Sequence, residues 1–216
     1  MTAVTLPSQP SARRPASAVL FDLDGVLVDS VRVVERAWLR WVHEQGLDAG
    51  EVMAAIHGRR AAEIVQQFAP GLDPAGQVQR ITSFEMADGD LTLIPGALEC
   101  VGVARRGPWA VVTSGGRELA RQRLAAVGFP APEILVTADD VEHGKPDPEP
   151  YLRAAEALGV PPAQCVVVED APAGVLAGKR AGMTVLAVTT THPADALTQA
   201  DKVFSAMDEV AGCLRS

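Results

Sequence analysis

The stretch "AVLFDLDGVLVDS", Ala18–Ser30, decides the fold. In it, a short apolar run leads directly into three carboxylates, Asp22, Asp24 and Asp29. An apolar run of this length predicts a strand buried in a parallel sheet. Ligands of such sheets bind at the carboxyl ends of the strands, so the first two aspartates are expected at a binding edge. Because crowded carboxylates repel one another, we expect a cation to bind among them.

The composition is that of a folded, acidic protein. Of the 216 residues, 48% are hydrophobic, which is enough to fill a core. The formal net charge of −8 disfavours a nucleic-acid partner. No apolar run reaches the roughly 18 residues that a membrane helix needs, and three cysteines without a CxxC pattern indicate thiols in a reducing compartment. We therefore expect a cytoplasmic protein, and nothing in the sequence demands more than a monomer.

Short β-rich runs alternate with helical patterns from Ala18 onward, which predicts an α/β fold: a Rossmann-like, doubly wound parallel sheet covered on both faces by helices. The expected strands are Ala18–Asp22, Trp109–Thr113, Ile134–Thr137, Cys165–Asp170 and Thr184–Val188, with Lys202–Phe204 as a possible edge strand. The expected helices are Gly96–Arg106, Arg117–Val127, Glu149–Leu158 and Ala173–Ala181, and the last three stop before a glycine.

One block lacks this alternation. Between Ser30 and Leu93 the sequence shows no convincing strand and only helical patterns, at Val31–Gln45, Glu51–Ile56, Arg60–Phe68 and Gly76–Ala87. We expect a small α-helical cap domain at residues 31–93, inserted into a core domain made of residues 18–30 and 94–216. Residues 1–17, rich in Pro and Ser, are expected to form a flexible tail.

The rim of the predicted sheet offers hard oxygen ligands without nearby His or Cys, which favours Mg²⁺. The expected ligands are Asp22, the backbone carbonyl of Asp24, and Asp170. Asp22 is also the expected nucleophile, because a carboxylate needs no base to activate it. Asp24 lies two residues further on. When Asp22 attacks a phosphoryl group, Asp24 can give a proton to the alcohol that leaves and later take one from the water that hydrolyses the phosphorylated aspartate.

Two further motifs supply groups for a phosphate. "WAVVTSGG" ends a strand with Thr113, whose hydroxyl can bind phosphoryl oxygens together with the amides of Ser114 and Gly115. "EHGKPDP" provides Lys145, one of only three lysines, which can offset the phosphate charge and keep Asp22 ionised.

The cap sequence "HGRR" contributes His57, Arg59 and Arg60. An anionic protein that binds a phosphate-bearing substrate needs hydrogen-bond donors on the segment that covers it, so we expect substrate contacts from this segment. A solvated helix start and a structural histidine are the alternative interpretation.

Four motifs in order, "FDLDGVLVDS", "VVTSGG", "GKPDP" and "VVEDAPAGVLAGKRAG", resemble those of the haloacid dehalogenase-like hydrolase superfamily, in its subgroup with a helical cap. "ERAWLRWVHEQGL", "IHGRRAAEI" and "LIPGALE" are similar to sugar-phosphate phosphatases of the 2-deoxyglucose-6-phosphate and glycerol-phosphate type. The resemblance implies a Mg²⁺-dependent phosphatase of small sugar or polyol monophosphates that forms an aspartyl-phosphate. It implies the same residue roles as above, with Glu169 supporting the metal shell.

Two other functions stay open at this stage. A β-phosphoglucomutase-like mutase would carry a cap histidine where this chain has Val34, so hydrolysis is favoured. A non-catalytic binding member of the fold would be expected to lack the nucleophile or the lysine, and both are present here. Phosphonate hydrolysis through a Schiff base requires a lysine in the cap. This chemistry is excluded because the sequence has no lysine between Ser30 and Leu93.

Overall fold

The computed structural model describes residues 18–215, so the expected flexible tail lies outside the described residues. A six-stranded sheet runs in the order β5-β4-β1-β6-β7-β8, and every neighbouring pair of strands is parallel. This confirms the expected α/β fold. The strands are β1 (Ala18–Phe21), β4 (Trp109–Val112), β5 (Leu135–Val136), β6 (Cys165–Glu169), β7 (Thr184–Val188) and β8 (Lys202–Phe204).

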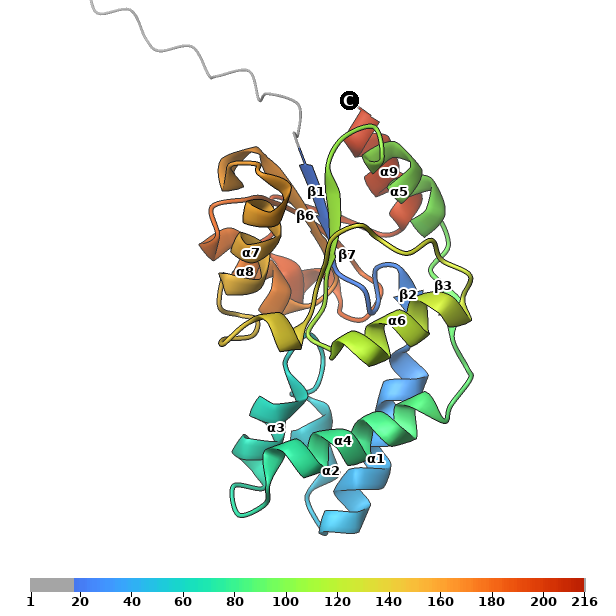
Figure 1. The fold of residues 1–216 in the computed structure, drawn as a ribbon, viewed down its shortest axis with the longest axis vertical. Helices are drawn as coiled ribbons and strands as arrows, with labels where there is room; N and C mark the ends of the chain where they lie inside the picture. The colour runs from blue at the N-terminus through green and yellow to red at the C-terminus, as the bar shows by residue number, and fades with distance from the viewer. Residues whose placement is uncertain (1–17, 216) are drawn as a thin grey trace, which may run out of the picture.

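Helices cover both faces of this sheet (Figure 1). Alternate residues of β1 point to opposite faces: Ala18 and Leu20 pack with α7 and α8, whereas Val19 and Phe21 pack with α5, α6 and α9. Buried apolar residues on both faces explain why the strands read as continuous apolar runs. The helices are α5 (Ala97–Ala104), α6 (Arg117–Ala126), α7 (Glu149–Leu158), α8 (Pro172–Arg180) and α9 (Met207–Arg215).

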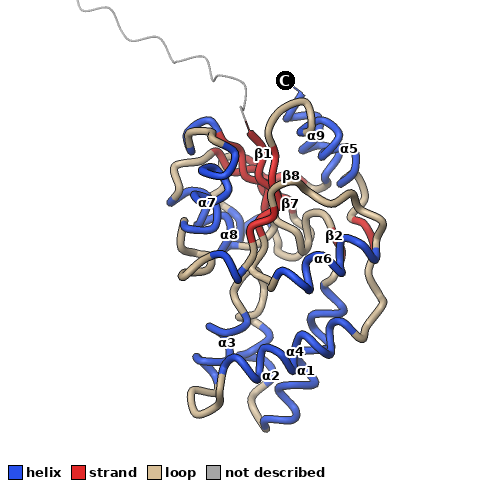
Figure 2. The backbone as a smooth tube through the Cα atoms, in the orientation of Figure 1, coloured by secondary structure: helices blue, strands red, loops and turns tan. Residues whose placement is uncertain are grey.

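Four more helices form a cap at one end of the molecule, away from the strands in Figure 2. They are α1 (Val31–Gln45), α2 (Ala49–Met53), α3 (Ala61–Phe68) and α4 (Pro74–Met86). The cap has its own apolar cluster, in which Trp38 and Trp41 meet edge to face at 5.5 Å between ring centroids. The indole of Trp41 also donates a hydrogen bond to Gln77, which ties α1 to α4.

The structure contains three elements that the sequence did not predict, two short strands and a helix. The expectation of no strand between Ser30 and Leu93 was wrong: β3 (Thr92–Leu93) pairs antiparallel with β2 (Val28–Asp29) beside the cap. Two-residue strands are too short to show an alternating pattern. The final helix, α9, was not predicted, although Met207, Val210 and Ala211 form a buried helical face. Short 3₁₀ turns occur at Ala138–Asp140, Pro162–Gln164 and Ala194–Leu197.

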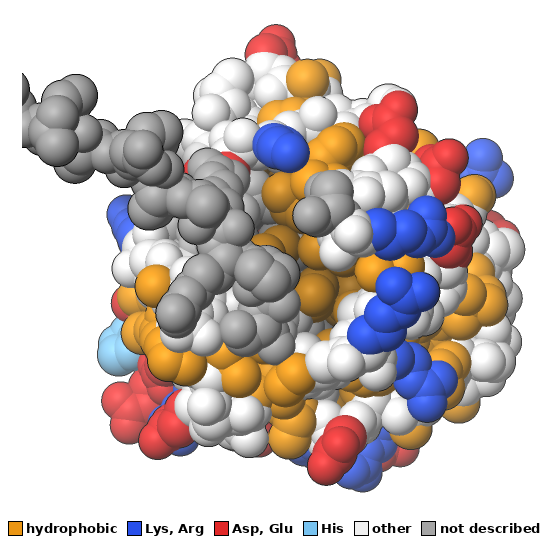
Figure 3. Space-filling model, turned by 90° about the horizontal axis from the view of Figure 1, so that it is seen from above, with side chains coloured by type: hydrophobic (Ala, Val, Ile, Leu, Met, Phe, Trp, Pro, Cys, Tyr) orange, Lys and Arg blue, Asp and Glu red, His pale blue; other side chains and the backbone are white. Residues whose placement is uncertain are grey.

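The end of the molecule opposite the cap is the face seen in Figure 3. Hydrophobic side chains are visible across its centre, and basic side chains gather along one side with acidic neighbours. Among the helices within residues 18–215, none combines the length and apolar character needed to cross a bilayer. The carboxyl ends of the strands lie at the other end, beneath the cap.

Candidate active site

A cavity of about 340 Å³ lies between the cap and the carboxyl ends of the strands. We call it the cap cavity. Its core side is lined by Asp22 and Asp24 after β1, by Thr113 after β4, and by Asp170 after β6. These three strands are neighbours in the sheet, which is why residues far apart in the sequence meet here.

Lys145 lies fully buried at the base of this site. Its Nζ donates to Asp22 Oδ1 at 2.8 Å, to Glu169 Oε1 at 2.8 Å and to the carbonyl oxygen of Val112 at 3.2 Å. All three ammonium protons therefore have partners. Burial alone would lower the pKa of Lys145, but the two carboxylates raise it above its usual value. Lys145 therefore stays charged, and it contacts Asp22, the expected nucleophile.

Glu169 uses every acceptor position of its carboxylate. Oε1 accepts from Lys145 and from the hydroxyl of Tyr151, each at 2.8 Å. Oε2 accepts from the amides of Asp170 and Ala171 at 2.9 and 3.1 Å. A carboxylate offers about four acceptor sites, so Glu169 is saturated by protein donors. Its contacts fix the lysine and the end of β6.

Asp22, Glu169 and Asp170 form an acidic cluster whose ligand oxygens lie within 4.8 Å of one another. Asp170 Oδ1 is buried and has no hydrogen-bond partner within the described part of the chain, while Thr191 donates to Oδ2. Gly25 allows this close approach, because it adopts a φ of 81° and a Cβ there would lie 2.0 Å from Asp170 Oδ2. An orphaned buried carboxylate oxygen beside two more carboxylates fits a hard divalent cation.

The electrostatics of the acidic cluster agree with this fit. Burial raises the pKa of Asp22 to about 7, and the Lys145 ammonium only partly offsets that effect. Burial, followed by the charges of Glu169 and Asp22, raises the pKa of Asp170 well above its usual value. Without a cation, the cluster therefore favours taking up protons.

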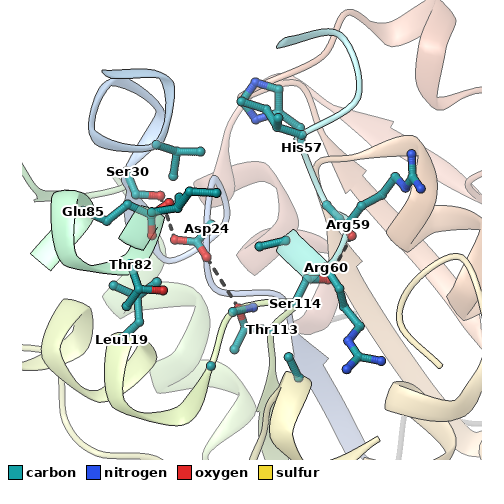
Figure 4. A pocket seen from close by; sticks show the side chains of 18 of the residues that line it. Asp24, Ser30, His57, Arg59, Arg60, Thr82, Glu85, Thr113, Ser114 and Leu119 are labelled. Carbon is teal, nitrogen blue, oxygen red and sulfur yellow. Dashed lines mark hydrogen bonds between the residues drawn. The ribbon is translucent and has the colours of Figure 1, made fainter. Parts of the chain in front are cut away.

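Asp24 points into the cap cavity (Figure 4). Its Oδ1 accepts hydrogen bonds from Ser30 Oγ at 2.7 Å and from Arg123 Nη1 at 2.6 Å. Its Oδ2 accepts one long contact, from Thr113 Oγ1 at 3.5 Å. The side chain is partly exposed, unlike Asp22.

The "TSGG" segment forms the loop after β4. Thr113 Oγ1 accepts from the amide of Gly115 at 3.1 Å, and Thr113 and Gly115 both line the cap cavity. Ser114 also lines it, but its hydroxyl donates to the carbonyl oxygen of Gly58 in the cap at 2.9 Å. The loop expected to bind phosphate thus also contacts the cap.

The structure places His57, Arg59 and Arg60 along the cap cavity, but the two guanidinium groups point away from Asp24 in Figure 4. Arg60 Nη1 donates to the carbonyl oxygen of Glu142 at 2.7 Å, and Arg59 Nη1 donates to Gln67 at 3.1 Å. Arg60 therefore joins the cap to the loop before Lys145. Burial and the nearby His192 ring lower the pKa of His57.

Several residues of the site were not singled out from the sequence. Tyr151 is the chain's one tyrosine, and helical periodicity predicts its burial but not its contact with Glu169. Arg123 carried a signal, because it falls on the apolar face of its helix between the buried Leu119 and Leu124. No sequence pattern pointed to Thr191. The same holds for His192, whose Nδ1 lies 3.2 Å from the carbonyl oxygen of Asp170.

The fold and the site together define a class of protein. A parallel α/β core with Asp22, Thr113, Lys145 and Asp170 at its carboxyl rim, beneath a helical cap, is the arrangement expected of haloacid dehalogenase-like hydrolases. The family model described as "haloacid dehalogenase-like hydrolase" matches residues 16–182. The chain belongs to this family.

Two curated relatives carry names of enzymes that hydrolyse phosphate esters. The chain is 43% identical over 197 residues to hexitol phosphatase A of Escherichia coli, covering 88% of this chain and 91% of the relative. It is 33% identical over 196 residues to glycerol-1-phosphate phosphohydrolase 2 of Saccharomyces cerevisiae, covering 85% and 78%. A solved structure described as a putative beta-phosphoglucomutase from Bacteroides vulgatus is 32% identical, with a TM-score of 0.78 and coverage of 93% and 88%.

These comparisons confirm the family and the fold class expected from the sequence. The named activities of the two curated relatives also agree with the expected enzyme class, a phosphoric monoester hydrolase for sugar or polyol phosphates.

The close packing around Glu169 leads to a prediction for Gly174 of α8. A Cβ at this position would lie 1.6 Å from Glu169 Oε1, so Gly174→Ala must displace the carboxylate that holds Lys145. We expect overpacking to lower the free energy of unfolding by about 1–3 kcal/mol and activity to fall with it. Urea denaturation and phosphatase assays measure both.

The matched control is Gly102→Ala in α5, where a Cβ meets nothing within 4 Å. Alanine is expected to raise the free energy of unfolding there by roughly 0.5–1 kcal/mol. A Gly174→Ala variant as stable and as active as the wild type would contradict the packing described for Glu169.

Proposed function

We propose that this protein is a Mg²⁺-dependent phosphatase that hydrolyses small sugar or polyol monophosphates through a phosphorylated Asp22. The observation that carries the proposal is the contact between Asp22 Oδ1 and the buried Lys145 ammonium at 2.8 Å, at the base of the cap cavity. Lys145 orients the carboxylate of Asp22, which lies beside the space that a phosphoryl group would enter. Carboxylates in such positions serve as nucleophiles.

The reaction then has two halves. A carboxylate oxygen of Asp22 bonds to phosphorus while the bond from phosphorus to the alcohol oxygen breaks, and Asp24 donates the proton that the leaving alcohol needs. In the second half, Asp24 takes a proton from water as the water oxygen attacks phosphorus. The bond to Asp22 breaks and phosphate is released. Asp24 suits both tasks because its Oδ2 faces the cavity beside Thr113.

The loop after β4 would bind the phosphoryl oxygens. Thr113 and Gly115 line the cap cavity, and the Lys145 ammonium adds a buried positive charge beneath it. Ser114, which contacts Gly58, would place the cap over the bound phosphate. Donors arranged around a phosphoryl group stabilise the negative charge of the transition state.

The acidic cluster fits Mg²⁺ through its orphaned Asp170 oxygen. Asp22, Asp170 and the backbone carbonyl of Asp24 are the residues that would hold the ion. Mg²⁺ supplies charge neutralisation between the carboxylate nucleophile and the phosphate. We assign Glu169 the role of holding Lys145. We do not count it among the ligands of Mg²⁺, because the acceptor positions of its carboxylate are filled.

A small phosphorylated sugar or polyol is the substrate class that fits best. The cap cavity, about 340 Å³, is at the small end of ligand sites. Its cap side mixes apolar side chains such as Val34 and Trp38 with polar ones such as His57 and Thr82. The names of two relatives, hexitol phosphatase A and glycerol-1-phosphate phosphohydrolase 2, state substrates of this kind. The side chain of Val34 cannot transfer a proton, and a mutase would need a group that can at this position. This supports hydrolysis over a mutase reaction, in which the phosphoryl group returns to the sugar.

The organisation of the chain is part of the proposal. Residues 31–93 would act as a cap that opens and closes over a core of residues 18–30 and 94–216. The protein would work as a monomer in the cytoplasm, where its three cysteines, none of which forms a disulfide within residues 18–215, stay reduced.

Replacing the nucleophile tests the proposal directly. Asp22→Asn keeps the side-chain shape but removes the attacking oxygen, so turnover should fall to the level of a blank while the fold is retained. Phosphate release from phosphorylated hexoses, pentoses, hexitols and glycerol phosphate measures activity, and circular dichroism checks the fold.

Asp29→Asn is the matched control, because Asp29 lies in the same segment but is exposed and outside the cap cavity. It should keep wild-type turnover. Retained turnover in Asp22→Asn would disprove the nucleophilic role.

Magnesium binding should depend on pH in a defined direction. The raised pKa values of Asp22 and Asp170 mean that the metal-free folded protein binds more protons than the unfolded chain. This contribution to stability is complete below the usual carboxyl pKa and is lost as pH rises toward 7. Mg²⁺ competes with those protons, so its stabilising effect should be larger at about pH 8 than at about pH 6.

Thermal unfolding with and without Mg²⁺ at the two pH values measures this effect. Asp170→Asn should lose most of the Mg²⁺ response. An equal response at both pH values in the wild type would argue against a cation bound by protonatable carboxylates.

A further inference from the structure

A second buried charge network lies on the other side of Asp24, away from Lys145. Arg123 of α6 donates through Nη1 to Asp24 Oδ1 at 2.6 Å and through Nη2 to Glu85 Oε2 at 2.9 Å. The side chains of Arg123 and Glu85 are 5% and 7% exposed. Arg123 lies 99 positions from Asp24 and 38 from Glu85 in the sequence. One guanidinium therefore joins a core loop, a core helix and the cap helix α4.

The geometry favours arginine over lysine at this position. Two amino groups of a planar guanidinium reach two carboxylates on different elements, which the single ammonium of a lysine cannot do with the same alignment. Arg123 Nε is buried and makes no hydrogen bond within the described residues, so the two amino groups hold the side chain. Charge-assisted hydrogen bonds of this kind are strong and directional.

The contacts distinguish the two oxygens of Asp24. Oδ1 accepts two short hydrogen bonds, from Ser30 and Arg123, and is fixed by them. Within residues 18–215, Oδ2 has only the long contact with Thr113, on the side of the loop that would bind phosphate. The oxygen that remains free to exchange a proton with a substrate is Oδ2. Oδ1 only accepts, so its contacts are compatible with Asp24 both before and after it gives up that proton.

Glu85 keeps the guanidinium in place from the cap side. It lies in the last turn of α4, and the next residue, Met86, accepts a hydrogen bond through its carbonyl from Gln122 of α6 at 3.0 Å. Two neighbouring positions of α6 thus contact the same end of α4. Only one of them, Arg123, also contacts Asp24.

We propose that Arg123 is a positioning residue for the proton-transferring Asp24, aiming Oδ2 at the substrate by fixing Oδ1, and that Glu85 of the cap sets the position of Arg123. This inference rests on the proposed phosphatase function. It differs from a purely structural ion pair between cap and core, which would hold the cap in place without any effect specific to proton transfer.

The leaving group separates these two roles. An aryl phosphate such as p-nitrophenyl phosphate expels a weakly basic phenolate and needs no proton, whereas glycerol phosphate expels an alkoxide that does. With enzyme in excess over substrate, the release of p-nitrophenol or glycerol in a single turnover reports the phosphorylation of Asp22 alone. Arg123→Gln should slow glycerol release about tenfold to a hundredfold, a part of the contribution that acid–base catalysis makes, and leave p-nitrophenol release within about twofold of the wild type.

Three further variants make the comparison decisive. Gln122→Ala removes the neighbouring contact between α6 and the cap, and should leave the ratio of the two rates unchanged. Arg123→Lys restores the charge and should recover part of the glycerol rate. The double variant Arg123→Gln with Glu85→Gln avoids leaving a buried Glu85 charge unpaired, and should show the same selective loss if Arg123→Gln alone does not fold.

Equal slowing of both substrates by Arg123→Gln or by the double variant, or no slowing of glycerol release, would overturn the positioning role. The same selective loss in Gln122→Ala would overturn it too, because that variant does not touch Asp24. A wild type that releases neither product in the presence of Mg²⁺ would instead refute the proposed function itself, so the two failures are distinguishable.

Discussion

Lys145 places a fully buried positive charge between the carboxylates of Asp22 and Glu169. Burying charges costs several kcal/mol per ion unless their hydrogen bonds are satisfied, and here the ammonium uses all three protons while Glu169 uses all its acceptor positions. With Asp170, three carboxylates face one lysine. Burial, together with this excess of negative charge, raises the pKa values of Asp22 and Asp170. The same excess is the reason why we propose a divalent cation at the acidic cluster.

The cap completes this arrangement from the opposite side. Gly58 accepts from Ser114, Arg60 donates to the loop before Lys145, and Glu85 holds Arg123 against Asp24. Each contact links a cap residue to a core segment that carries a site residue. In the proposed function, closing the cap would therefore do more than exclude water, because it would also set the side chains that carry out the reaction.

Sequence reasoning predicted the sheet and the rim because both depend on local patterns: apolar runs ending in Asp22, Thr113 and Asp170 imply a shared edge. It could not predict contacts that depend on how the cap sits. Substrate contacts were expected from the segment with His57, Arg59 and Arg60, and all three line the cap cavity. The guanidinium groups of the two arginines bind Gln67 and the Glu142 carbonyl, which no sequence pattern predicted. The bridge from Glu85 through Arg123 was missed for the same reason, because no spacing rule joins a cap helix to a core helix.

The most direct test of this account is to find the phosphoryl group on the protein. Enzyme that is turning over a phosphorylated polyol with Mg²⁺ is quenched rapidly in acid, digested and mapped by mass spectrometry. The account predicts an acid-stable, hydroxylamine-sensitive phosphoryl group on the peptide that contains Asp22, bonded to that carboxylate. Phosphoryl transfer to any other residue, or steady turnover with no phosphorylated peptide at any time after mixing, would contradict it.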